Sequence, residues 1–511
     1  MIWIHWKPVY RLANSRNPTP PRQHSSGQDK QAQALRLLAD LRDRLAEGAR
    51  DRIVALLLQL ENLAPSMGPQ WLALARIAGN QAEVALARRL MALYLDQTGR
   101  SAANLYNAAH LLAQMDLWGE ALDIMRGIPA GQLDPAALAH SRGTAELYCG
   151  DPQTARQLLE EAVRLRPHSA PSWLSLATLV NFAEEEVLAD RLAMASAQYA
   201  GLSETNAILF AQAMGKMLAE RGEHDRAFAC FAQSAELARR TAPYDAGQAA
   251  QEAAESVAGF DPASLTALAR TQTEPTDRTL FVTGLPRSGT TLTAQILTSH
   301  STIAGAAEIN RVSLLVQDIG GRSGDAVKAH LQAHPAPDLA RLWHRWLDER
   351  FSPGARAVDK TIGASRMMGV IAALLPQAPL VWLVRDPLDC AWSCLRNWFN
   401  GDFRWRFRQE DMAHHFRLED DLRRRWQDML GDRLLVLRYE DLARDPAGTI
   451  PRLLAHCGLA DEPAVYAPHR NTRAVTTSSV MQVRQPISPM GIGAAAPYRA
   501  HLEPFLAAYQ A

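Results

Sequence analysis

The hydrophobic pattern of this chain changes once, near residue 278. Over residues 36–245, alanine and leucine recur every three to four positions, which is the spacing of helices that bury one face. From residue 279 on, short apolar runs alternate with stretches of helical spacing. The pattern therefore predicts an all-helical N-terminal region followed by an α/β domain with a central parallel sheet covered by helices.

The helical region contains an internal repeat. Four alanines follow one another at intervals of 34 residues, the length of a tetratricopeptide repeat: Ala87, Ala121, Ala155 and Ala189. The third unit fills the small, small, large, small and proline positions of that repeat with Gly143, Ala155, Leu159, Ala162 and Pro167. Small residues let the two helices of a hairpin approach closely, and neighbouring hairpins must stack to bury their apolar faces. We expect a helical solenoid over residues 36–245; the alternative is an irregular helical bundle.

Polar and turn-forming segments divide the chain. Residues 1–35 are rich in Pro, Ser and Gln and are expected to form an N-terminal tail. Residues 246–277 end in a polar run and are expected to be a linker with a short helix. Residues 278–511 would then be the second domain. The repeats are expected to contact mainly each other, because each hairpin buries its apolar face against the next.

Charge and hydropathy exclude several classes of protein. The chain has 54 basic and 54 acidic residues, so it lacks the basic excess that is typical of nucleic-acid-binding proteins. No apolar run is long enough to span a bilayer, and no secretory signal pattern opens the sequence. We expect a cytoplasmic protein with no integral membrane segment and no nucleic-acid partner.

The five cysteines do not indicate a disulfide framework or a metal site. Their number is odd and their density is low. Cys390 and Cys394 lie four positions apart on an expected helix, but no further cysteine or histidine pair completes a zinc ligand set. We expect buried thiols and no bound metal.

The stretch after residue 278 has the pattern of a phosphate-binding loop. An apolar run at residues 280–282 predicts a buried strand, residues 284–291 form a glycine-bounded loop, and helical spacing follows. Backbone N–H groups of such a loop and the helix N-terminus bind phosphate. Thr290 occupies the position of the lysine that ATPases and GTPases use, and Arg287 is the nearest cation. The loop is thus poorly suited to Mg²⁺-dependent phosphoryl transfer.

The sequence PRSGTT at residues 286–291 resembles the 5′-phosphosulfate loop of sulfotransferases that use 3′-phosphoadenosine 5′-phosphosulfate (PAPS). The arginine in it is similar to that of protein-tyrosine sulfotransferases and of bacterial proteins that join tetratricopeptide repeats to a sulfotransferase domain. The resemblance covers residues 276–511, and the repeats extend it. It implies a P-loop-like α/β sulfotransferase domain whose loop binds the donor through Arg287, Ser288, Gly289, Thr290 and Thr291.

Further donor-binding residues follow from the same resemblance. Arg385 closes the apolar strand at residues 380–384, and Ser393 comes eight positions later, as in the family's 3′-phosphate site. The alternative is a surface ion pair and a serine on a helix surface. Lys360 resembles the family's lysine beside the donor, with a surface lysine as the alternative. Arg484, in a late loop, is the available cation that would close over the nucleotide.

Three residues are expected to take part in catalysis. Arg287 would stabilise charge on the bridging oxygen as it leaves. Glu308 lies where tyrosine-sulfating members carry a glutamate that removes the proton of the acceptor hydroxyl; the alternative is a solvated or capping glutamate. Ser479 is the best match for the serine that approaches the sulfuryl group. No metal is required by this chemistry.

One segment departs from the family pattern. After the late loop the family shows glycine, a basic residue and tryptophan, whereas here Gly493 is followed by alanines at residues 494–496. A methyl group can neither pair with phosphate nor stack on adenine. We therefore expect weaker donor binding than in relatives with the full motif, unless Arg470, Arg473 or Arg484 compensates.

The resemblance also suggests an acceptor. Solenoids present concave surfaces to polypeptides, and the arginine-type loop favours a protein or peptide tyrosine hydroxyl, with the repeats recruiting the acceptor or a partner. The runner-up hypothesis is a non-catalytic repeat adaptor whose nucleotide-binding domain is a scaffold. A P-loop kinase ranks third because the loop lysine is missing.

Overall fold

The computed structural model describes residues 27–399, 403–471, 473–475 and 480–511. Among these residues, no helix combines the length and apolar character needed to cross a membrane. Ser479, expected above to be catalytic, lies outside the described residues.

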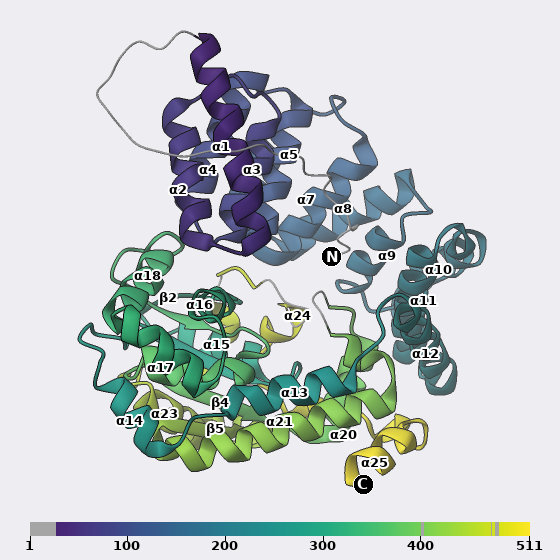
Figure 1. The fold of residues 1–511 in the computed structure, drawn as a ribbon. Coiled ribbons are helices and arrows are strands. Elements are labelled where there is room, and N and C mark those ends of the chain that lie inside the picture. Colours follow the sequence, from purple (N-terminus) through teal and green to yellow (C-terminus); the bar gives the residue numbers. More distant parts are fainter. Residues whose placement is uncertain (1–26, 400–402, 472, 476–479) are drawn as a thin grey trace.

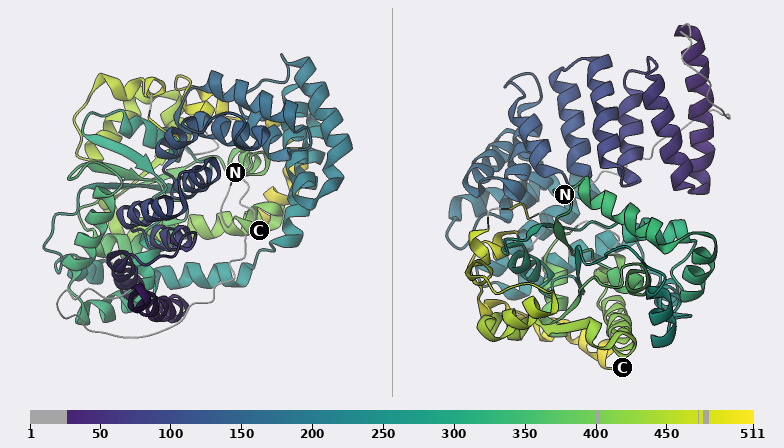
Figure 2. Two further views of the ribbon diagram at one scale, coloured as in Figure 1. Left: turned by 90° about the horizontal axis from the view of Figure 1, so that it is seen from above. Right: turned by 90° about the vertical axis from the view of Figure 1, so that its left-hand side faces the viewer.

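The N-terminal region is a solenoid of antiparallel helical hairpins, as predicted. Its first helix begins at Gly27 rather than at residue 36. The helices are α1 (Gly27–Glu47), α2 (Arg50–Leu63), α3 (Gln70–Asn80), α4 (Val84–Thr98), α5 (Ala102–Gln114), α6 (Trp118–Arg126), α7 (Pro135–Cys149), α8 (Pro152–Leu165), α9 (Ala170–Ala177), α10 (Glu186–Tyr199), α11 (Glu204–Glu220) and α12 (His224–Thr241). We call residues 27–241 the array; its first hairpins stand in a row above the second domain (Figure 2).

The small residues of the repeat lie where helices cross most closely. A Cβ atom on Gly143 would come within 2.8 Å of the Leu159 side chain, and one on Gly215 within 2.7 Å of the Phe231 ring. The repeated alanines at positions 87, 121, 155 and 189 are each at most 1% exposed. The small residues of the sequence repeat therefore coincide with the closest contacts between the helices of a hairpin.

The second domain contains a five-stranded parallel sheet. Its strands are β1 (Thr279–Gly284), β2 (Ile303–Ala307), β3 (Arg356–Asp359), β4 (Leu380–Val384) and β5 (Leu434–Arg438), in the order β2-β3-β1-β4-β5. The sequence predicted β1, β3, β4 and β5 but not β2, whose small residues lack an apolar run. Because all strands are parallel, their carboxyl ends meet at one edge, where ligands of such sheets bind.

Helices cover both faces of this sheet (Figure 1). They are α13 (Ala246–Val257), α14 (Pro262–Ala269), α15 (Thr290–Thr298), α16 (Val312–Ile319), α17 (Gly324–Ala333), α18 (Ala336–Asp348), α19 (Met368–Leu374), α20 (Pro387–Arg396), α21 (Gln409–Leu430), α22 (Tyr439–Arg444), α23 (Pro446–His456), α24 (Val480–Val483) and α25 (Glu503–Gln510). The segment expected to be a linker forms α13 and α14, which pack on α21 and α19. It is therefore part of the covering layer.

The array and the sheet domain share an apolar core, so the repeats contact the second domain as well as each other. One cluster joins side chains of α9–α12 to those of α20, α21 and the C-terminal helix. Within it the ring of Phe231 on α12 meets the indole of Trp392 on α20 edge-on, with centroids 5.5 Å apart. Both side chains are at most 1% exposed. The last hairpins are thus built into the domain.

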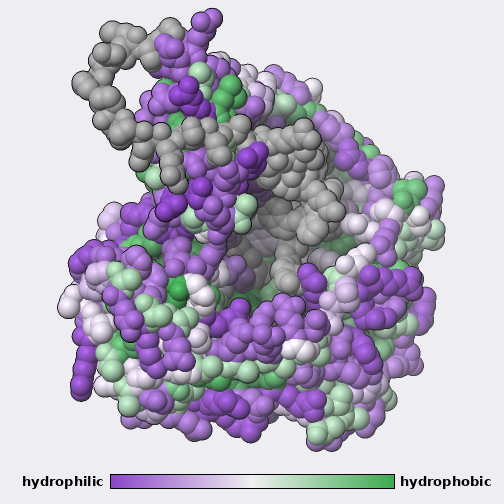
Figure 3. Space-filling model, in the orientation of Figure 1, coloured by the Kyte–Doolittle hydropathy of each residue, from purple (hydrophilic) through white to green (hydrophobic). Residues whose placement is uncertain are grey.

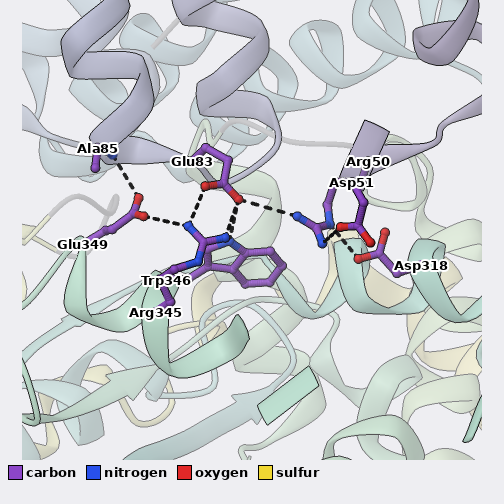
Figure 4. A network of polar contacts seen from close by, with 8 residues as sticks. All are labelled: Arg50, Asp51, Glu83, Ala85, Asp318, Arg345, Trp346 and Glu349. Carbon is purple, nitrogen blue, oxygen red and sulfur yellow. Dashed lines mark hydrogen bonds and ion pairs between the residues drawn. The ribbon is translucent and has the colours of Figure 1, made fainter. Parts of the chain in front are cut away.

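A second attachment, at the other end of the array, is ionic (Figure 4). The Glu83 carboxylate before α4 accepts hydrogen bonds of 2.5 and 2.7 Å from Arg345 of α18. It also lies 3.5 Å from Arg50, whose Nε donates to Asp318 of α16 over 2.6 Å. The side chains of Glu83 and Arg50 are 5% exposed. Buried charges of this kind are tolerated only because they are paired.

Candidate active site

The loop between β1 and α15 has a backbone that its residues explain. A Cβ atom on Gly284 would come within 2.4 Å of the Leu383 carbonyl oxygen, and one on Gly289 within 2.8 Å of the Tyr439 ring. Only glycine fits in such places. Arg287 itself has φ of 72°, an uncommon conformation for a residue with a side chain. Strained residues of this kind cluster at functional sites.

This loop borders a cavity of about 310 Å³, the donor cavity. The other walls come from the ends of β4 and β5 and from the late part of the chain: Arg385, Ser393, Arg396, Tyr439, Gln482, Gln485 and Gly491. The carboxyl ends of neighbouring parallel strands bring these segments together. The structure therefore unites the two segments that the sequence assigned to the 5′- and 3′-phosphates of one nucleotide.

The Arg287 guanidinium donates hydrogen bonds to Ser393 and Gln482. Its Nε donates to the Ser393 Oγ over 2.9 Å, and its Nη2 donates to the Gln482 Oε1 over 2.9 Å. Burial lowers the pKa of Arg287 to about 10, and the neighbouring charge of Arg396 acts in the same direction. The guanidinium is still protonated at neutral pH, so it brings a positive charge to the cavity.

Arg385 contacts three segments: the loop after β1, the late segment at Gly491, and Tyr439 after β5. Its Nη1 donates to the Arg287 carbonyl oxygen over 2.9 Å, and its Nη2 donates to the Gly491 carbonyl oxygen. The guanidinium lies over the Tyr439 ring at 4.5 Å. Its Nε is buried and has no hydrogen-bond partner among the described residues. A buried donor without a partner carries a desolvation cost that an anionic ligand would relieve.

Glu308 and Lys360 form an ion pair. The Lys360 Nζ donates to the Glu308 Oε1 over 3.0 Å, and the two residues follow the adjacent strands β2 and β3. The Lys360 side chain is 6% exposed and that of Glu308 is 40% exposed. The described residues that line the donor cavity do not include Lys360. The carboxylate is thus the accessible member of the pair.

Arg484 is not among the described residues that line the donor cavity. Burial lowers its pKa, while Cys149 and Asp151 of the array act in the opposite direction. Its Nη1 is buried without a partner among the described residues. Among the described residues of this segment, Gln482, two positions earlier, contacts Arg287.

Arg396, which lines the donor cavity, was not identified from the sequence. Arg396 ends α20, and among the described residues it has no ion-pair partner; burial lowers the pKa of its guanidinium. It lies three positions after Ser393, hence on the same face of the helix. That spacing was the available signal.

The alanine segment that departs from the family pattern packs against α20. The N–H groups of Gly493 and Ala495 donate to the Asp389 carboxylate over 2.7 and 2.9 Å. Ala495 is 1% exposed, and the Tyr498 ring stacks on Trp392 with centroids 3.6 Å apart. A tryptophan at position 495 would not fit this packing.

A second cavity, of about 590 Å³, adjoins the first and contains Glu308. Both cavities are lined by Arg287, Thr290, Thr291 and Arg396. A group transferred between ligands in the two cavities would therefore pass beside Arg287. Among the described residues, no cluster of three or more His, Cys, Asp or Glu side chains is arranged to hold a metal ion.

Residues 279–463 match the family model described as the sulfotransferase family. An uncharacterized protein of Aquifex aeolicus (strain VF5) is 27% identical over 303 residues, which are 57% of this chain. The chain spans about two fifths (40%) of the length of that curated relative.

Solved structures with partial similarity include two sulfotransferases. The sulfotransferase domain of the Synechococcus PCC 7002 olefin synthase is 19% identical, with a TM-score of 0.33, over 44% of this chain and 90% of that one. Sulfotransferase STF1 from Mycobacterium tuberculosis H37Rv is 15% identical, with a TM-score of 0.25, over 68% and 96%. Pseudomonas aeruginosa pilF is 20% identical, with a TM-score of 0.29, over 43% and 95%.

Proposed function

We propose that this chain, whose residues 279–463 form a sulfotransferase-family domain, transfers a sulfuryl group from PAPS to an acceptor hydroxyl. One observation carries the proposal. The PRSGTT loop and the Arg385–Ser393 segment, expected from sequence to bind opposite ends of one nucleotide, line a single cavity and are joined by the Arg287–Ser393 hydrogen bond.

The donor-binding groups fit two phosphates. The N–H groups of residues 288–291 and the N-terminus of α15 would hold the 5′-phosphate. Arg385, with its unpartnered Nε, and Ser393 would hold the 3′-phosphate. Bound PAPS supplies the activated sulfuryl group. Arg287 would neutralise charge on the oxygen from which that group departs.

Glu308 would remove the proton of the acceptor hydroxyl. It lines the second cavity together with Arg287, so base and cation border the same space. Its ion pair with Lys360 fixes the carboxylate at the wall of the second cavity. The chemistry then consists of positioning, proton removal and charge stabilisation by this chain's own residues, with no metal required.

From the sequence, the arginine-type loop favours a tyrosine hydroxyl of a polypeptide recruited through the array, whereas the lining of the second cavity favours a small neutral acceptor. The alternative function, a non-catalytic adaptor, has one observation in its favour. Both Nη atoms of Arg385 already donate to chain carbonyl groups, as a scaffold residue would. Retention of Arg287, Glu308 and Ser393 around connected cavities argues for the enzyme.

The test is incubation of the full chain with ³⁵S-labelled PAPS and a panel of phenols, alcohols, peptides and lysate proteins, with and without EDTA. We expect label in an acceptor in both conditions. Absence of transfer together with tight 3′-phosphoadenosine 5′-phosphate (PAP) binding would favour the adaptor. Phosphoryl transfer from ATP that EDTA abolishes would favour a kinase.

A further inference from the structure

The cavity that contains Glu308 is walled on its far side by the array. Figure 3 shows the molecule hollowed between the array and the sheet domain. The array residues that line the cavity lie on α7, α9, α11 and the turn after α9, and include Tyr148, Leu174, Thr178, Leu179, Val180 and Lys216. The array is therefore part of the second cavity itself.

A partly buried ion pair on α11, between Lys216 and Glu220, holds this wall in place. The Lys216 Nζ donates to the Val180 carbonyl oxygen over 2.9 Å and pairs with Glu220. The Glu220 carboxylate accepts a hydrogen bond of 2.9 Å from the Phe182 N–H. Helix α11 thereby clamps the turn after α9. Contacts within the chain fix this wall, which lowers the entropic cost of binding.

The opposite side of the cavity is aromatic. Trp398 and Phe399 line it, and the buried Arg406 guanidinium lies 4.6 Å from the Trp398 ring and 4.5 Å from the Phe399 ring. The Arg406 Nη1 also donates to the Asn397 carbonyl oxygen over 2.6 Å. Cation–π contacts of this kind fix ring orientation. A flat apolar body would be enclosed between these rings and the array.

The charged residues of the cavity belong either to the array wall or to the side that it shares with the donor cavity. Five charged residues among those described line the second cavity: Lys216, Glu220, Glu308, Arg287 and Arg396. The first two pair with each other, and Glu308 pairs with Lys360. The two arginines also border the donor cavity. Among the described array residues that line the cavity, a charged group of an acceptor would thus meet only the Lys216–Glu220 pair, and its burial there would be unfavourable.

We propose that the array forms the acceptor-binding wall, and that the acceptor is a small neutral hydroxyl compound with an apolar body. The inference rests on the proposed function and names the acceptor class of the same site. The cavity volume of about 590 Å³ is in the range of small-molecule sites. The hydroxyl would point toward Glu308 and Arg287, and the body would lie on Leu174, Leu179 and Val180.

The first test compares acceptors of matched size with the full chain and labelled PAPS. The pairs are 4-propylphenol against 3-(4-hydroxyphenyl)propanoate, and 1-octanol against 8-hydroxyoctanoate; a tyrosine peptide with acidic flanks is the third class. We expect kcat/KM at least tenfold higher for a neutral member than for its anionic partner and for the peptide. Preference for an anionic member or for the peptide would overturn the inference.

A cavity-filling variant tests the wall. Thr178 is exposed to the cavity, so Thr178→Trp fills space without entering the core. Val187→Trp, at an array position that is 74% exposed and absent from the described cavity lining, is the matched control. We expect KM for the preferred neutral acceptor to rise at least tenfold in Thr178→Trp only, with PAP affinity unchanged. Equal KM values in the two variants would overturn the proposal that the array forms the acceptor-binding wall.

The two proposals fail differently. If the wild type neither binds PAP nor transfers the sulfuryl group, the proposed function is refuted. PAP binding with transfer only to polypeptides, or with no turnover of any neutral acceptor, would overturn the acceptor class and leave the donor site in place.

Discussion

Arg287 and Ser393 are joined by a hydrogen bond of 2.9 Å from Nε to Oγ, across 106 positions of the sequence. One residue belongs to the loop after β1 and the other to the helix after β4, and these two strands are neighbours in the sheet. The bond fixes the direction of a guanidinium that stands at the junction of two cavities. The proposed site of sulfuryl transfer is this junction.

Replacing Arg287 should remove charge stabilisation rather than donor binding. We expect Arg287→Ala to lower kcat roughly 10²–10³-fold, with a much smaller loss of PAP affinity. Because Arg287 has φ of 72°, Arg287→Gly is the matched control that keeps the backbone unstrained. Steady-state kinetics should give equal kcat for the two variants. Turnover near that of the wild type in either would exclude Arg287 from the mechanism.

Replacing Glu308 should abolish proton removal and leave the fold intact. Glu308→Gln keeps an oxygen that can accept from Lys360, and we expect kcat to fall roughly 10²-fold or more while PAP affinity is unchanged. Glu410→Gln, at a glutamate of α21 paired with Arg408, is the control. A kcat for Glu308→Gln equal to that of the control would assign the proton transfer elsewhere.

The ionic attachment of the array should contribute to stability. Glu83→Ala leaves Arg50 without one of its acidic partners and removes the acceptor of two hydrogen bonds that Arg345 donates. Loss of one member of a buried pair costs roughly 3–5 kcal/mol, so the first unfolding transition in urea should move to lower concentration. Glu236→Ala, which removes an exposed pair within α12, should leave that transition in place. Equal urea midpoints for the two variants would refute a contribution of the ionic attachment to stability.

The buried carboxyl at the end of β3 should make stability depend on pH. Burial raises the pKa of Asp359 to about 6, against hydrogen bonds from Thr361 that lower it. The native state therefore holds this proton more tightly than the unfolded chain, and stability falls as pH rises from about 4 to about 6.

Asp359→Asn should remove this dependence. Relative to the wild type, the variant should gain stability as pH rises through that window, by up to about 3 kcal/mol at pH 7. Thermal unfolding midpoints measured at pH 4.5 and pH 7 check it. A difference between the two proteins that is constant across pH would contradict the assignment.

The sequence predicted those features that depend on neighbours along the chain. The repeat spacing and the apolar runs of β1 and β4 indicated helices and strands, because burial of a periodic face is a local property. Strand β2 was missed because its residues are Ile303 followed by alanine and glycine. Small residues fit between neighbours but give no hydrophobic signal.

Contacts between distant segments could not be predicted. The core formed by Phe231 and Trp392 joins the two regions, yet each residue separately is typical of any buried helix face. The same holds for the site: the resemblance indicated Arg385 and Ser393, but Gln482 contacts Arg287 only through the folded arrangement of the late segment. The array wall of the second cavity has no sequence signature.

Calorimetric titration of the full chain with PAP, in EDTA, tests the central claim most directly. We expect one site per chain with micromolar or tighter affinity in the wild type. Ser393→Ala, which loses a hydroxyl donor, should bind roughly tenfold more weakly, and Ser203→Ala, at the N-cap of α11, should bind as the wild type does. Absence of heat in the wild type, or equal affinity of Ser393→Ala and the wild type, would contradict the placement of the donor between the loop and α20.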